Sequence, residues 1–279
     1  MDSVSGGLRA EDVARFNAFG FLALPGLLSR REAEALRAEC EDLTLAENPG
    51  WDRTTAAGIH GLCEKGHRHG LLLDDDRLYD IPHKLLGHDF LYEGSACSWY
   101  DGDTPWHGGS GAVTWAVPHI KVALYLDDLG PDDGCLRVLP GAHRNYLRMI
   151  DDRWCDPPDY FLPVRNRNTR DDFRPWGLTP EEVPHILLPT RPGDVLVFTE
   201  DLPHAAFGSS GLRVQVALSF LARPRTPQQI AYLHSRSGWA GPISAPRTLL
   251  ESGSERRRRM AQGLVDVGQG LVDVGLEIR

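Results

Sequence analysis

The chain has 279 residues, of which 41% are hydrophobic and 25% charged, and its formal net charge is −9 at pH 7. This composition is typical of a folded globular protein and excludes a disordered, collagen-like or disulfide-dominated chain. No segment approaches the ~18 uncharged apolar residues that a membrane helix needs, and no secretory signal is readable at the N-terminus. The acidic balance argues against binding of a nucleic-acid polymer through its phosphates. Five widely spaced cysteines without a CxxC pair indicate reduced thiols, so we expect a cytoplasmic protein.

The first 47 residues predict a helical cover. Residues 11–19 place Val13, Phe16 and Phe19 on one stripe, and Gly20 ends this helix. Ser29 begins a second helix, because Glu32 three residues later completes a capping box. Residues 48–106 are expected to be irregular, apart from a helix around residues 78–86. The histidine- and cysteine-rich segment 60–69 lacks the spacing of a closed zinc site, so a polar loop is the expectation there.

From residue 112 onward the pattern is typical of short strands. Apolar residues alternate over 120–126 and again over 213–220, and further strands are expected at 135–139 and 194–198. Many short strands after N-terminal helices indicate a mainly β fold with helical cover, built on a jelly roll, that is, a cupin-like double-stranded β-helix. We expect a single domain over 1–279 with its core at about 90–222. Residues 151–185 then form an insertion or lid, and 251–279 form a tail that carries a seven-residue repeat at 262–268 and 269–275.

Three polar residues are candidates to converge inside such a fold. His107 lies in Trp-His-Gly-Gly, His204 follows 97 residues later, and Arg213 begins a predicted strand. A single histidine is more often a hydrogen-bonded structural residue than a metal ligand. The hypothesis of a site therefore depends on the combination of the three.

Four motifs occur in an order that resembles a known family. They lie at residues 16–29, 122–128, 133–144 (which contains Pro-Gly-Ala-His) and 192–198, and His204 and Arg213 follow. Over roughly residues 10–222 the chain resembles the phytanoyl-CoA dioxygenase group of Fe(II)- and 2-oxoglutarate-dependent oxygenases. The resemblance implies that His107 and His204 bind Fe(II), that Arg213 pairs with the distal carboxylate of 2-oxoglutarate, and that O2 is consumed.

The chain departs from this family pattern at one position. Such oxygenases complete their iron site with a carboxylate two residues after the first histidine, and here that residue is Gly109. The related aliphatic halogenases carry Gly or Ala at this position, where chloride takes the place of the carboxylate. The main prediction is therefore a halogenase that chlorinates an unactivated aliphatic C–H bond in secondary metabolism, as in antibiotic biosynthesis.

Two alternatives stay open. In the first, the protein is a hydroxylase whose third ligand comes from elsewhere, with Asp101, Asp103 and Asp201 as the nearest candidates in the sequence. In the second, the metal site has decayed and the jelly roll is a catalytically inactive binding protein. Glycine is also common in turns, and Gly109 lies in a segment with the composition of a turn.

Strand periodicity and the composition of the insertion suggest further site residues. If Arg213 points inward, so do Gln215, Ala217 and Ser219, while Lys121 and Tyr125 share a face. We expect Ser219 or Ser110 to donate to chloride and Lys121 to line the site. The insertion carries arginines beside aromatic residues, namely Arg165, Arg167, Arg170, Arg174, Trp154, Tyr160, Phe161, Phe173 and Trp176.

Arginine beside aromatic residues can hold a phosphate and stack a base, although the many aspartates of the same segment also allow a self-paired loop. The chain also resembles, more loosely, the nucleotide halogenases of nucleoside-antibiotic pathways. The predicted substrate is therefore a free small molecule, first a purine nucleotide such as deoxyadenosine monophosphate. A substrate held on a carrier protein is the second choice.

Overall fold

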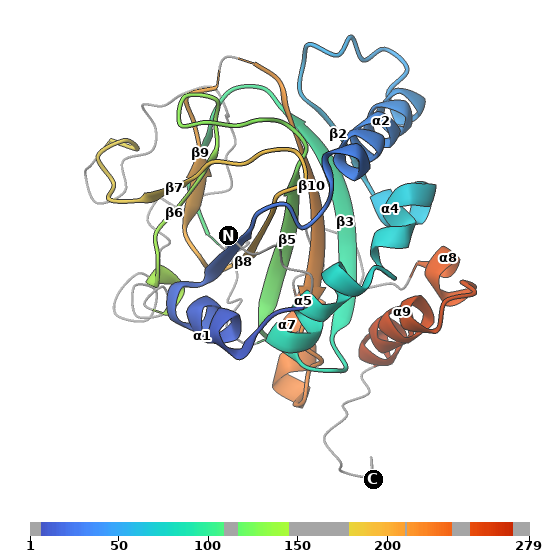
Figure 1. The fold of residues 1–279 in the computed structure, drawn as a ribbon. Coiled ribbons are helices and arrows are strands. Elements are labelled where there is room, and N and C mark those ends of the chain that lie inside the picture. Colours follow the sequence, from blue (N-terminus) through green and yellow to red (C-terminus); the bar gives the residue numbers. More distant parts are fainter. Residues whose placement is uncertain (1–6, 109–116, 145–178, 210, 236–245, 270–279) are drawn as a thin grey trace.

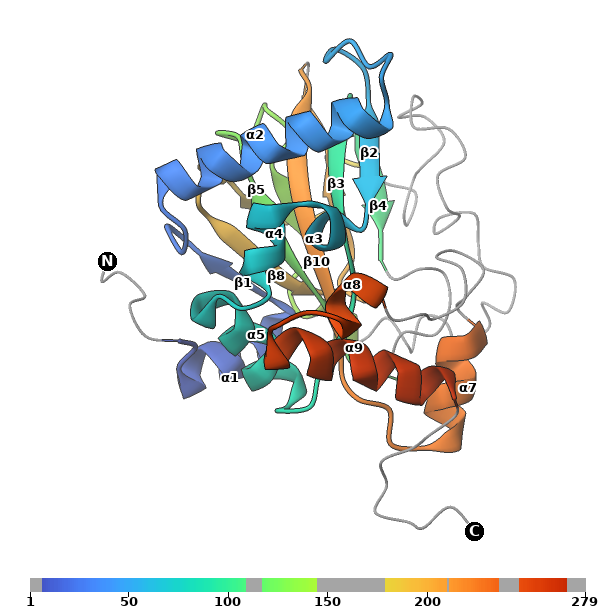
Figure 2. The ribbon, with the colours of Figure 1, turned by 90° about the vertical axis from the view of Figure 1, so that its right-hand side faces the viewer.

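The computed structural model describes residues 7–108, 117–144, 179–209, 211–235 and 246–269. Two antiparallel sheets face each other, and helices cover the outer face of the larger one (Figures 1 and 2). This arrangement confirms the predicted jelly roll with helical cover. The larger sheet has the order β1 (Phe21–Leu24), β8 (Val195–Thr199), β5 (His119–Tyr125), β10 (Arg213–Leu221), β3 (Leu91–Tyr100) and β2 (Ala57–His60). The smaller sheet has the order β4 (Thr104–His107), β9 (His204–Ala206), β6 (Leu136–Val138) and β7 (Ile186–Leu188).

The two faces of the larger sheet differ in burial because its central strands alternate. Along β10 the outward residues Val214, Val216, Leu218 and Phe220 are fully buried in the core beneath the helices. The residues between them, Gln215, Ala217 and Ser219, are only half-buried. The outer face is therefore a dry core. The inner face is packed only in part, because Ala123, Tyr125 and Phe198 are buried against the smaller sheet while the β10 residues beside them stay partly exposed.

Strand β3 was not predicted, and the expectation of an irregular segment over 48–106 is wrong at this point. Nine of its ten residues pair with β10, from Tyr100 opposite Arg213 to Leu91 opposite Leu221, and a bulge at Glu93 interrupts the ladder. Its sequence, Leu-Tyr-Glu-Gly-Ser-Ala-Cys-Ser-Trp-Tyr, is rich in small residues that have weak β propensity. Pairing with β10 outweighs this preference, and the small side chains lie where the inner face needs space.

The helices of the cover begin and end as the local signals require. In α2 (Arg30–Glu47) the Ser29 side chain accepts from the Glu32 backbone N–H, while the Glu32 carboxylate accepts from the Ser29 backbone N–H, which confirms the predicted capping box. Gly20 ends α1 (Ala10–Phe19) with φ of 83°, a left-handed conformation that glycine adopts without strain. Helix α5 spans Asp76–Leu86, close to the predicted segment.

The segment 60–69 forms two short helices rather than a loop. They are α3 (Leu62–Lys65) and α4 (His67–Leu72). His69 is fully buried there and its ring contacts the Glu39 carboxylate at 2.6 Å and the Cys40 thiol at 3.4 Å. Because its ring is occupied by these partners inside the helical layer, His69 is a structural residue.

After the sheets the chain continues through α7 (Pro227–Ser235) and α8 (Arg247–Leu250). The described part of the predicted tail then forms α9 (Glu255–Gly268), which contains the first copy of the repeat. Leu264 and Val267 of that copy are buried against Leu91 and Leu221. None of the helices in the described ranges has the length and apolar character needed to cross a membrane.

Candidate metal and co-substrate site

The two predicted iron ligands lie side by side on the inner face of the smaller sheet. His107 ends β4, His204 begins β9, and the two residues are direct partners in the antiparallel ladder. Their ring centroids are 4.1 Å apart with the ring planes tilted by 52°. The His204 ring also lies 4.8 Å from the ring of Phe198, which projects from β8 of the facing sheet. Two residues separated by 97 positions therefore present their imidazoles to the same point between the sheets.

The backbone sets the tautomer of both rings in the same way. The Nδ1–H of His107 donates to the carbonyl of Pro105 at 2.8 Å, and that of His204 donates to the carbonyl of Leu202 at 2.7 Å. A carbonyl only accepts, so Nδ1 carries the proton and Nε2 keeps its lone pair when the ring is neutral. Burial, together with the charges of His107 and Lys121, holds the pKa of His204 well below its usual range. Neutral imidazoles with a fixed Nε2 lone pair suit a divalent metal.

Arg213 is a buried cation held by neutral groups. Its guanidinium donates to the carbonyl of Gly102 at 2.7 Å and to the Thr104 hydroxyl at 3.4 Å, and it lies 5.4 Å from the centroid of the Tyr100 ring. Across the described ranges, no carboxylate lies within 4.0 Å of it, although only 3% of the residue is exposed. Burial accordingly lowers its pKa. The charge of Asp103 acts on this guanidinium only from a longer distance. A buried guanidinium whose hydrogen-bond partners are neutral suits a carboxylate supplied by a ligand.

The inner face between Arg213 and the histidines combines small residues with one polar row. Gln215 Nε2 donates to the Tyr125 hydroxyl at 2.8 Å, and the Tyr100 hydroxyl donates to Gln215 Oε1 at 3.4 Å. The next row consists of alanines, since Ala217 pairs with Ala123 on one side and with Ala96 on the other. We refer to this inner surface of β3, β10 and β5 as the floor. Ala96 and Ala217 are half-buried, so this part of the floor stays accessible, whereas Ala123 is fully buried.

The residue at the third ligand position lies outside the described residues, because these end at Gly108 and resume at Val117. The same holds for Ser110 and for the arginines and aromatics of the insertion between 145 and 178. Of the alternative carboxylates, Asp103 accepts from the backbone N–H of Gly208 at 2.8 Å. A metal site would need donor atoms within 4.8 Å of one another. Among the described residues, none of Asp101, Asp103 and Asp201 meets this criterion together with His107 and His204.

Lys121 and Ser219 are direct partners in the floor, one row beyond the alanines. The Lys121 ammonium lies 5.9 Å from the centroid of the Phe198 ring and 3.7 Å from a carboxylate oxygen of Glu200. Lys121 therefore lies beside the ring that contacts His204, and Ser219 is its neighbour on the floor. Their predicted roles toward chloride and cofactor remain predictions.

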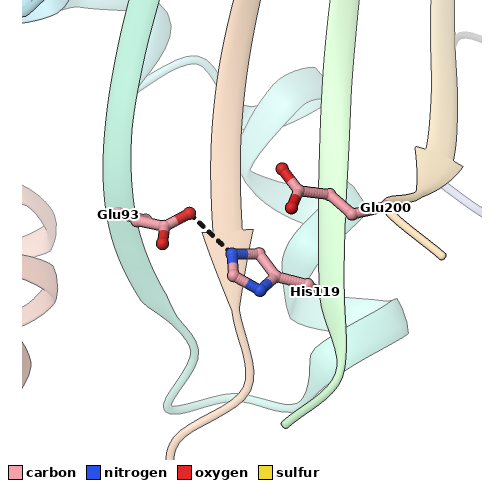
Figure 3. A group of neighbouring side chains, drawn as sticks. All are labelled: Glu93, His119 and Glu200. Carbon is pink, nitrogen blue, oxygen red and sulfur yellow. Dashed lines mark hydrogen bonds and ion pairs between the residues drawn. The ribbon is translucent and has the colours of Figure 1, made fainter. Parts of the chain in front are cut away.

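One cluster at this end of the floor was missed by the sequence analysis. Glu93, His119 and Glu200 place their donor atoms within 4.8 Å of one another, and His119 contacts the Glu93 carboxylate at 2.6 Å (Figure 3). Glu93 belongs to β3, His119 begins β5, and Glu200 follows β8. His119 shares the inner face with Lys121 two residues later, and this spacing was the signal available in the sequence.

Comparison with known proteins gives a family match and relatives of low identity. A family model described as phytanoyl-CoA dioxygenase (PhyH) matches residues 16–214. An ectoine dioxygenase of Sphingopyxis alaskensis is 24% identical over 230 residues, which cover 72% of this chain and 71% of that protein. Other curated relatives at similar identity are named as hydroxylases of methylphosphonate and of L-proline.

Solved structures agree with the fold. HygX from Streptomyces hygroscopicus, solved with nickel and 2-oxoglutarate bound, is 21% identical with a TM-score of 0.59, and the match covers 79% of this chain and 90% of HygX. EctD from S. alaskensis with bound iron is 19% identical with a TM-score of 0.55, and the match covers 78% of each chain.

Proposed function

The chain belongs to the phytanoyl-CoA dioxygenase (PhyH) family, and we propose that it is an Fe(II)- and 2-oxoglutarate-dependent oxygenase that chlorinates an unactivated aliphatic C–H bond of a free small molecule. One observation carries the choice of chlorination: glycine stands at position 109, where a carboxylate ligand is expected, while His107, His204 and Arg213 are all present.

The described residues fit the implied cofactors. His107 and His204 would hold Fe(II) through Nε2, and Arg213 would take the distal carboxylate of 2-oxoglutarate. When bound, iron and 2-oxoglutarate would activate O2, the oxidant for removal of a hydrogen atom from the substrate carbon. The chain orients the two imidazoles through the carbonyls of Pro105 and Leu202. The facing sheets enclose the space over the floor, which limits access of bulk water.

Charge balance supports a halide. A ligand set of two neutral histidines lacks the negative charge that an aspartate supplies, and chloride restores that charge. A glycine also leaves the volume of a side chain for it. Overall, substrate C–H, chloride, a proton, 2-oxoglutarate and O2 give substrate C–Cl, succinate, CO2 and water. Two electrons from the C–H bond and two from 2-oxoglutarate reduce O2.

Hydroxylation is the second candidate, and the comparisons favour it. The curated relatives are named as dioxygenases and hydroxylases, and none of those cited above is named as a halogenase. A hydroxylase would need a third protein ligand, for which Asp101, Asp103 and Asp201 are the candidates nearest in sequence. The proposed substrate, a purine nucleotide such as deoxyadenosine monophosphate, rests on the resemblance and on the arginines and aromatics of the insertion. A carrier-bound substrate is the alternative.

The deciding measurement is an anaerobic titration with Fe(II) and 2-oxoglutarate, in chloride and in chloride-free buffer, with the visible charge-transfer band as the readout. We expect the formation or position of the band to depend on chloride. A band indifferent to chloride contradicts the halogenase and leaves the hydroxylase. Absence of a band in both buffers would show that His107 and His204 do not form a working metal site.

Gly109→Asp tests the same idea from the protein side. We expect it to abolish chlorination and the chloride dependence of the band, because a carboxylate would occupy the place of the halide, while some consumption of 2-oxoglutarate remains. Gly253→Asp is the control. A Cβ at Gly253 meets no atom within 4 Å, and this residue belongs to the helical cover, far from the site in the sequence. Chlorination by Gly109→Asp at the parent rate would overturn the argument.

A further inference from the structure

The floor has two chemically different ends. Arg213, Gln215, Ala217 and Ser219 follow one another on it, so Arg213 and Ser219 lie roughly 20 Å apart along β10 at about 3.3 Å per residue. The Arg213 end carries the buried cation and the tyrosine hydroxyls. The Ser219 end carries Lys121 and, beside it, Glu200, Glu93 and His119. Figure 3 shows the last three. If 2-oxoglutarate binds toward Arg213, the other end is left for the substrate.

A β-bulge contributes to this second end. The ladder between β10 and β3 pairs Ser219 with Gly94 and the next residue, Phe220, with Tyr92, so it passes over Glu93. Tyr92 remains packed in the helical core, while the Glu93 carboxylate reaches His119. Bulges re-aim side chains and occur next to functional sites. The bulge in the β10–β3 ladder therefore directs the Glu93 carboxylate to the space beside Lys121 and Glu200.

The Lys121–Glu200 pair presents a hydrogen-bond donor next to an acceptor. The Lys121 ammonium and the Glu200 carboxylate lie 3.7 Å apart, with 28% and 13% of their side chains exposed. Lys121 lies beside the ring of Phe198, and the ring of His204 contacts Phe198 from the other sheet. A group bound by this pair would therefore lie close to the candidate metal ligand His204, with the Phe198 ring between them.

We propose that Lys121 and Glu200, with Glu93 and His119 beside them, recognise the substrate. They would select a heterocyclic ring whose edge presents a hydrogen-bond donor next to a hydrogen-bond acceptor. This inference rests on the proposed function and names the substrate chemistry of the same site. The 6-aminopurine edge matches, because its exocyclic N–H donates and its N7 accepts, whereas the corresponding edge of a 6-oxopurine presents two acceptors. Glu200 would accept from the amino group and Lys121 would donate to N7.

A metal ion is the competing occupant of this cluster. A histidine and two carboxylates are suitable ligands for one. However, His119 already contacts Glu93, and the Lys121 ammonium beside Glu200 repels a cation. The Lys121 charge therefore disfavours a metal ion and favours a neutral ring that forms hydrogen bonds through its edge.

The test is an equilibrium binding measurement by calorimetry on the anaerobic protein loaded with Fe(II) and 2-oxoglutarate. The probes are deoxyadenosine monophosphate and deoxyinosine monophosphate. We expect the parent protein to bind the 6-amino nucleotide at least about 10-fold more tightly. Glu200→Gln should bring this ratio near one, because an amide can also donate to the 6-oxo group. Lys121→Met should weaken both nucleotides, since both carry N7. The control is Glu255→Gln, at an exposed residue of α9.

The outcomes separate the inference from the proposed function. A ratio unchanged in Glu200→Gln, no binding of either nucleotide, or a loss of 2-oxoglutarate affinity in Glu200→Gln each overturns the inference. So does saturable Zn²⁺ binding that His119→Ala removes while His107 and His204 are intact. The charge-transfer band, recorded on the same samples, tests the proposed function independently. A band indifferent to chloride together with the expected nucleotide ratio would leave this subsite in a hydroxylase.

Discussion

Burial changes the chemistry of individual residues in this protein. His204 and Arg213 are both buried, and burial lowers the pKa of each. For His204 the consequence is a neutral ring that can bind a metal. For Arg213, whose pKa starts far above neutrality, the guanidinium stays charged and its unscreened charge favours an anionic partner.

Arg213→Lys tests that partner. We expect the affinity for 2-oxoglutarate to fall roughly 30- to 150-fold, since an ammonium cannot form the bidentate, charge-assisted pair that is worth about 2–3 kcal/mol. Anaerobic titration of 2-oxoglutarate measures the change. Arg30→Lys, at an exposed position of α2, is the matched control. An unchanged affinity in Arg213→Lys would place the co-substrate elsewhere.

Strand β10 separates stability from ligand binding at the scale of a single element. Leu218 is fully buried on the helical side, whereas its neighbour Ala217 is half-buried in the floor. Consecutive residues of a strand point to opposite faces, so one strand serves the dry core and the partly exposed floor at once.

Two adjacent substitutions should therefore have opposite effects. Leu218→Ala should lower the free energy of unfolding by about 2–5 kcal/mol, because it leaves a cavity in the core. Ala217→Leu should change that free energy by less than about 1 kcal/mol, because Ala217 is only half-buried. It should also block 2-oxoglutarate binding, because it fills the floor. Denaturant unfolding and 2-oxoglutarate titration of both variants check this. Equal effects of the two variants would contradict the two-faced sheet.

At the scale of the whole molecule, arginines connect the helical cover. Arg77 of α5 donates to the carbonyl of Leu27, to Glu32 of α2 at 2.7 Å and to Asp75. Arg256 and Arg257 of α9 pair with Asp76 and Asp74 near the start of α5. The basic run at 256–259 is therefore partly engaged in ion pairs that hold α9 against the cover.

The Arg77–Glu32 pair should make stability depend on pH. The Arg77 guanidinium lowers the pKa of Glu32 to about 2. A carboxylate whose pKa is lower in the folded state stabilises the protein above its unfolded pKa, and this contribution is lost as the pH falls toward the folded pKa. Glu32→Gln keeps a capping side chain and removes the charge.

We therefore expect Glu32→Gln to be less stable than the parent at pH 7, with the difference closing between about pH 5 and pH 2. Because 44% of the Glu32 side chain is exposed, solvent screens the pair and the difference should stay below about 1 kcal/mol and shrink further in high salt. Denaturant unfolding across this pH range measures it. A difference independent of pH would show that the ion pair does not contribute.

The amino-acid sequence alone determined the features that depend on local pattern. Strand alternation at 213–220, the capping box at Ser29 and the turn at Gly20 are set by neighbouring residues, and the structure confirms them. His107, His204 and Arg213 were also identified from the sequence, because their order resembles a family pattern. The structure adds the ladder that makes the two histidines partners.

Only the tertiary structure decided β3 and the cluster that it completes. The small residues of β3 carry no strong strand preference, so the strand forms through pairing with β10, more than a hundred residues later. Glu93 and His119 come from two strands and Glu200 from the turn after a third, and a bulge directs Glu93 toward the other two. Register between distant strands is a non-local property that depends on packing of the whole sheet, and local pattern does not contain it.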